Sequence, residues 1–125
     1  MLRALVIDDD KLIRWSLREI FSQAGHQVET ASLPTDALAK AEASNYDLIF
    51  SDFEIENTSM ASMLKALHQL QPEAILVILS GMNKNQIESQ LSGLPIFRII
   101  GKPFEAEDIR ALAREIQDSH KSKTT

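Results

Sequence analysis

The chain has 125 residues, of which 44% are hydrophobic and 25% charged, with a net charge of -5 and no cysteine. This length suits one domain with its own core, and the acidic balance argues against a nucleic-acid-binding surface, which needs clustered Lys and Arg. Disulfides and cysteine zinc sites are excluded, no apolar run reaches the ~18 residues of a membrane span, and acids follow the start too soon for a signal peptide. We therefore expect a cytoplasmic domain with no direct nucleic-acid or membrane partner.

Short apolar runs alternate with helical patterns along the whole chain. The patterns predict strands at 4–7, 26–30, 46–52, 74–79 and 96–100, and helices at 11–24, 34–44, 59–70, 83–92 and 106 to about 117. Asp10 is placed to cap the first helix and Gly25 to end it. Ser32 and Pro34 indicate a capped, proline-started second helix.

Five strand–helix repeats predict an α/β fold, a doubly wound five-stranded parallel sheet with helices on both faces. We assign residues 1–117 to this domain and residues 118–125 to a polar, frayed tail or the start of a linker. The fourth helix is polar, with Ile87 and Leu91 as its only apolar anchors, and we expect it to be the loosest.

Acidic and polar side chains follow the predicted strands. Asp8 and Asp9 follow the first strand, Asp52 the third, Ser80 the fourth and Lys102 the fifth. The carboxyl ends of parallel strands share one edge of a sheet, where ligands collect. Clustered carboxylates raise one another's pKa values unless a cation lies among them, and oxygen-only ligands suit Mg²⁺. Because an aspartate can also form an acyl phosphate, the spacing predicts a metal-assisted phosphoryl-transfer site.

Each of these side chains also has an ordinary structural explanation. A lone Asp52 or Ser80 at a strand end is typical of a turn, and Lys102 before a proline is typical of a solvated loop. Asp10 is better explained as a helix cap than as a ligand. A functional site is favoured only because Asp52, Ser80 and Lys102 all occur together at strand ends.

Four segments resemble the signature of bacterial two-component response-regulator receiver domains: Val6–Asp10, Asp52, Ser80–Gly81 and Lys102–Phe104. The resemblance covers residue 2 to about residue 117 and implies a flavodoxin-like (βα)5 fold with strand order 2-1-3-4-5, as in chemotaxis regulators. Residues 10–15 also resemble the receivers of nitrogen-regulation-type transcription activators.

The resemblance implies a phosphoprotein with a magnesium site. Asp52 would accept a phosphoryl group from a sensor histidine kinase or a histidine phosphotransfer protein. Asp9 and Asp52 would bind Mg²⁺ directly, Asp8 would help through water, and the backbone carbonyl of Glu54 would complete the protein ligands.

The resemblance also implies a conformational switch. Ser80 would move toward the phosphoryl group, and Lys102, joined to Pro103 by a cis bond, would pair with it. The output face would comprise the fourth helix, fifth strand and fifth helix, through which homodimers could also form. An output domain, if the protein has one, lies outside this chain.

The sequence departs from the family pattern at three places, one of which is the polar fourth helix described above. Glu56 and Met60 stand in the loop after the acceptor where a proline and a glycine are usual, so we expect a less rigid loop. Ile99 stands where many receivers have Tyr or Phe, and Phe97 lies two residues earlier on the same strand face. The kinase-facing loop and the output face are therefore the least predictable parts.

Three functions compete. The leading interpretation is a phosphorylation-driven switch, which catalyses its own aspartyl phosphorylation and dephosphorylation but turns over no external substrate. The alternative is a pseudo-receiver that acts as a protein-interaction module without being phosphorylated. A third is a Mg²⁺-dependent phosphatase with Asp52 as nucleophile and Glu54 as second acid, although no cap domain encloses a substrate.

Overall fold

Five strands form one parallel sheet in the order β2-β1-β3-β4-β5, as the resemblance implied. The computed structural model describes residues 1–53 and 60–124, and side chains as far as residue 119. The strands are β1 (Arg3–Ile7), β2 (Gln27–Ala31), β3 (Leu48–Asp52), β4 (Ile75–Ser80) and β5 (Ile96–Gly101). The helices that alternate with them are α1 (Lys11–Gln23), α2 (Pro34–Ala43), α3 (Met60–Leu70), α4 (Lys84–Gln90) and α5 (Ala106–Thr124).

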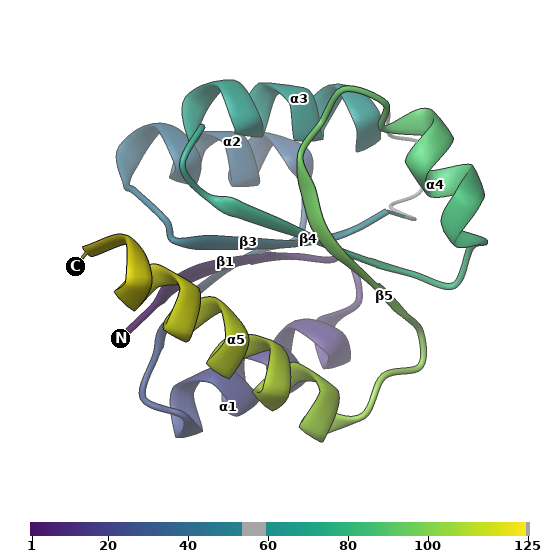
Figure 1. The fold of residues 1–125 in the computed structure, drawn as a ribbon. Helices are drawn as coiled ribbons and strands as arrows, with labels where there is room; N and C mark the ends of the chain where they lie inside the picture. The colour runs from purple at the N-terminus through teal and green to yellow at the C-terminus, as the bar shows by residue number, and fades with distance from the viewer. Residues whose placement is uncertain (54–59, 125) are drawn as a thin grey trace.

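Helices cover both faces of the sheet (Figure 1). One core cluster joins the sheet to α2, α3 and α4, and it includes Leu5, Ile49 and Ile87. The other joins it to α1 and α5, and there the rings of Phe21 and Phe50 meet edge to face with centroids 5.3 Å apart. All five residues of β3 are buried, as expected of a central parallel strand. The residues that follow these strands are therefore attached to a sheet that is packed on both faces.

The ends of the first two helices test the capping predictions. Asp10 caps α1, because its side chain accepts hydrogen bonds from the backbone N–H groups of Leu12 and Ile13. Gly25 follows the helix with a φ of 89°, a conformation that favours glycine. The expected cap at Ser32 is wrong: Leu33 is the N-cap of α2 and makes no side-chain capping bond, so Pro34 alone marks this start.

The last helix is longer than the sequence pattern indicated. It runs to Thr124, so the predicted end near residue 117 is wrong. The apolar periodicity does end at Ile116, but the following residues contain neither glycine nor proline to stop the helix. Within the described ranges, no helix combines the length and apolar character that crossing a membrane requires.

His26 is a buried side chain that joins the start of β1 to the end of α1. Its Nδ1 accepts a hydrogen bond of 3.0 Å from the backbone N–H of Leu2, and its ring packs on Phe21. This bond requires the neutral imidazole at Nδ1. Burial, aided by the charge of the N-terminal ammonium, lowers the pKa of His26 below its usual 6.5.

We expect acid to weaken the fold through His26. Because the folded-state pKa is lowered, the stabilisation is complete above the unfolded pKa and is lost as pH falls below about 6.5. Between pH 7 and pH 5.5, the free energy of unfolding of wild type should fall by up to about 1 kcal/mol more than that of His26→Gln. Urea titrations at both pH values measure this difference. Parallel pH profiles of the two proteins would contradict it.

Candidate functional site

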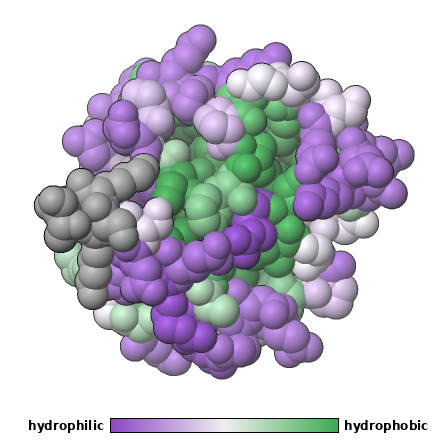
Figure 2. Space-filling view, in the orientation of Figure 1, coloured by the Kyte–Doolittle hydropathy of each residue, from purple (hydrophilic) through white to green (hydrophobic). Residues whose placement is uncertain are grey.

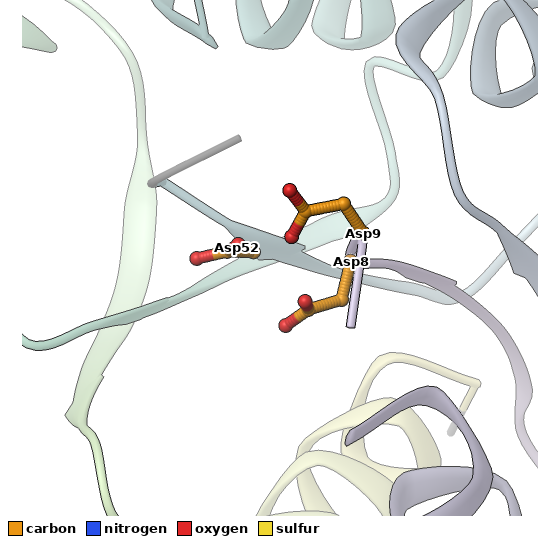
Figure 3. Close-up of side chains that lie close together, drawn as sticks. All are labelled: Asp8, Asp9 and Asp52. Atoms are coloured by element: carbon orange, nitrogen blue, oxygen red, sulfur yellow. The ribbon is translucent and has the colours of Figure 1, made fainter. Parts of the chain in front are cut away.

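Three carboxylates meet at the carboxyl ends of β1 and β3. The two strands pair directly, with Ile7 opposite Ser51, so the residues that follow them share one edge of the sheet. Oxygen atoms of Asp8, Asp9 and Asp52 all lie within 4.8 Å of one another. Figure 3 shows Asp8 and Asp9 extending from the end of β1 toward the side on which Asp52 lies. The structure thus brings together the three acids that the strand ends indicated.

The acids differ in their exposure to solvent. Asp8 is fully buried and Asp52 is 2% exposed, whereas Asp9 is exposed. The pKa of Asp8 is raised to about 6, mainly by burial; the charge of Asp52 also raises it, whereas the Asp10 N–H and Lys102 lower it. A carboxylate in this position is costly to ionise without a cation beside it.

Lys102 is the cation that faces the acids. Its Nζ lies 2.9 Å from Oδ1 of Asp52 and 3.4 Å from Oδ2 of Asp8. Its backbone N–H donates to the carbonyl of Ser80, and its bond to Pro103 is cis, as the resemblance implied. Burial alone would lower the pKa of Lys102, but the hydrogen bond and charge of Asp52, together with Asp8, outweigh it and raise the pKa. Lys102 therefore stays protonated and paired with Asp52.

Ser80 and Glu54 complete the predicted set. Ser80 is buried at the end of β4, beside β3, and its Oγ accepts a hydrogen bond of 2.9 Å from the N–H of Met82. This bond is typical of a serine turn. Glu54 and the atypical loop with Glu56 lie outside the described residues.

The main chain after β1 is held by hydrogen bonds around Asp8. Its N–H donates to the carbonyl of Ala31, and its Oδ1 accepts from the N–H of Asp10 at 2.9 Å. Its carbonyl accepts a hydrogen bond of 2.7 Å from Nη1 of Arg14. The sequence reasoning gave Arg14 no role. The only available signal was an arginine in the first turns of the helix that the acids precede.

The acidic cluster fits a small divalent cation. Its donors are carboxylate oxygens, the hard ligands that Mg²⁺ and Ca²⁺ prefer. Oδ2 of Asp8 is buried and accepts no hydrogen bond from the described residues, although Lys102 lies at ion-pair distance. A hydrated cation at this point would provide that oxygen with an electrostatic partner and relieve the repulsion among the three acids.

A second feature is the hydrophobic surface over β5. Figure 2 shows it at the centre of the displayed face, where Figure 1 places β5 with α4 and α5 beside it. A groove of about 380 Å³ is lined there by Leu91, Phe97 and Ile99, among others. Phe97 is 36% exposed, and Arg98 stacks on its ring while pairing with Glu115 at 2.7 Å. Phe97 and Ile99 thus share one groove, as the strand period predicted.

Comparison with known proteins gives a consistent result. A family model described as "Response regulator receiver domain" matches residues 4–114. The transcriptional regulatory protein DltR of Streptococcus agalactiae is 29% identical over 115 residues, which cover 90% of this chain and 50% of DltR. The chain therefore spans about half the length of this curated relative.

Solved structures agree on the architecture. The structure of NtrX from Brucella abortus superposes with a TM-score of 0.87 at 26% identity, covering 98% of this chain and 29% of that one. A response regulator protein from Burkholderia pseudomallei, described as having a phosphorylated aspartic acid, calcium ion and citrate, gives a TM-score of 0.81 at 26% identity. That match covers 100% of this chain and 76% of the other.

Proposed function

Because this chain belongs to the response regulator receiver domain family, we propose that Asp52 is its phosphoacceptor. The observation that carries the proposal is the pairing of Asp52 with Lys102 at 2.9 Å beside Asp8 and Asp9. A cation-compensated carboxylate at a strand end is the arrangement that phosphoryl transfer needs, since that reaction depends on positioning and charge neutralisation. The phosphorylated aspartate and calcium ion of the Burkholderia relative support the same assignment.

The reaction would be an in-line transfer to a carboxylate oxygen. A bond forms between Asp52 and phosphorus as the bond from phosphorus to the donor's histidine nitrogen breaks, and the released imidazole takes up a proton. Bound Mg²⁺ would neutralise charge on the phosphoryl oxygens. Asp9 and Asp52 would ligate it directly, and Asp8 through water. Lys102 would remain beside Asp52 and hold a phosphoryl oxygen, and Ser80 would donate to another.

Receiver domains interact with histidine kinases or phosphotransfer proteins, and we assign such a protein as the donor. The charge of the phosphoryl group would change the positions that Ser80 and Lys102 favour. Because Ser80 ends β4 and Lys102 follows β5, this change would alter the α4-β5-α5 face. The groove with Phe97 on that face would contact an output domain, a target or a second copy. The interaction-only alternative is not favoured, because the acids and the lysine are all present.

Intact mass measurement tests this proposal. We expect the protein to gain the mass of one phosphoryl group on incubation with Mg²⁺ and a small acyl phosphate, and no gain in EDTA. Reductive trapping and peptide mapping should place the group on Asp52. We also expect beryllium fluoride with Mg²⁺ to raise the melting temperature. Absence of both responses would contradict the phosphoacceptor role and favour the interaction module.

A further inference from the structure

We propose that Arg14 is a positioning residue for the cation-binding carboxylates, acting through the main chain of Asp8. The inference rests on the proposed function, because it concerns the same acidic cluster. It goes beyond that function by assigning a role to a side chain on α1 that does not belong to the cluster itself.

Arg14 holds the peptide that joins Asp8 to Asp9. Nη1 of Arg14, a half-buried residue, donates a short, charge-assisted hydrogen bond to the Asp8 carbonyl at 2.7 Å. The peptide is planar, so fixing its carbonyl also fixes the plane from which the Asp9 side chain departs. Asp9 is exposed and has no strand to hold it. Its direction therefore depends on this peptide.

The other contacts of Asp8 leave this task to Arg14. The Asp8 N–H donates to β2, and the carboxylate accepts from the Asp10 N–H. These two bonds fix the N-terminal side and the side chain of Asp8. Oδ2 faces Lys102 at 3.4 Å, and the guanidinium of Arg14 holds the carbonyl that leads into Asp9. Partners one step removed from a metal typically change its affinity 10–100-fold when they are lost.

Arg18 provides a matched control. Arg14 and Arg18 line the same groove of about 200 Å³ beside α1, together with Lys11, Trp15 and Thr30. Both carry one positive charge on the same helix, four residues apart. Among the described residues, no hydrogen bond or ion pair joins Arg18 to Asp8, Asp9 or Asp52. Replacing Arg18 thus removes a similar charge without removing the bond to the Asp8 carbonyl.

Positioning and simple electrostatics predict opposite results. A cationic guanidinium repels Mg²⁺, so removing its charge should tighten Mg²⁺ binding if the residue acts only through its charge. If Arg14 positions Asp9, removing it should weaken Mg²⁺ binding despite the relieved repulsion. The direction of the change in Kd therefore separates the two roles.

The experiment is calorimetric Mg²⁺ titration of wild type, Arg14→Gln, Arg14→Lys and Arg18→Gln at fixed ionic strength. We expect Kd to rise about tenfold in Arg14→Gln, to rise less in Arg14→Lys, which keeps the charge and one donor, and to stay equal or fall in Arg18→Gln. The Mg²⁺-induced rise in melting temperature should be reduced most in Arg14→Gln, less in Arg14→Lys and not at all in Arg18→Gln. Arg14→Lys decides the question if Arg14→Gln does not fold.

Equal or tighter Mg²⁺ binding by the Arg14 variants would overturn this inference while leaving the proposed function intact. A similar loss in Arg18→Gln would also overturn it, because the effect would then belong to the helix as a whole. Absence of Mg²⁺ binding by wild type would instead overturn the magnesium site and, with it, this role for Arg14.

Discussion

Asp52→Asn is expected to abolish phosphorylation by an acyl phosphate in the presence of Mg²⁺, with the rate reduced by at least about 10³-fold. An amide has the shape of a carboxylate but lacks its nucleophilic anion, so it cannot form the bond to phosphorus. The fold should survive, since the amide oxygen can still accept the hydrogen bond that Lys102 makes with Oδ1. Intact mass after timed incubation measures the loss.

Asp36→Asn is the matched control for this substitution. Asp36 is an exposed carboxylate on α2 that pairs with Lys40 and does not belong to the acidic cluster, so its replacement removes the same charge outside the cluster. We expect the control to be phosphorylated at the wild-type rate. Retained phosphorylation of Asp52→Asn would place the acceptor on another residue, such as Asp9, the exposed acid of the cluster.

The sequence predicted the layout of the site because that layout follows from chain topology. Parallel strands end at one edge, so the order of strand-end residues was enough to indicate that Asp8, Asp9, Asp52 and Lys102 would meet. The burial of the apolar anchors Ile87 and Leu91 on α4 was equally readable from their spacing.

Features that depend on single side-chain contacts were not predictable in this way. The bond from Arg14 to a backbone carbonyl leaves no periodic pattern, because many arginines occupy exposed helix positions without such a partner. The continuation of α5 to Thr124 was missed for a related reason: a polar sequence without glycine or proline is compatible with both helix and tail. The cap of α2 was misplaced because Ser32 and Pro34 are both typical of helix starts, whereas in the structure Pro34 alone marks the start.

Asp8→Asn is expected to stabilise the metal-free protein, although it removes a residue of the proposed cation site. The folded state holds the Asp8 carboxylate in a fully buried position, with its pKa raised to about 6 from an ordinary value of 3.8. A carboxyl group with a raised pKa destabilises the fold fully above its folded pKa, and not at all below its unfolded pKa. The asparagine carries no charge to bury, while its Oδ1 can still accept from the Asp10 N–H.

The expected gain in the free energy of unfolding is about 2 kcal/mol at pH 7.5 in EDTA, and it should shrink toward zero as pH falls to about 4. Urea titrations across this range measure it, with Asp8→Ala as a control that removes both the charge and the acceptor and should gain less. Saturating Mg²⁺ should reverse the order, because the cation compensates the charge only in wild type. A less stable Asp8→Asn in EDTA would show that the ion pair with Lys102 outweighs the cost of burial, and that the acids need no cation to be held together.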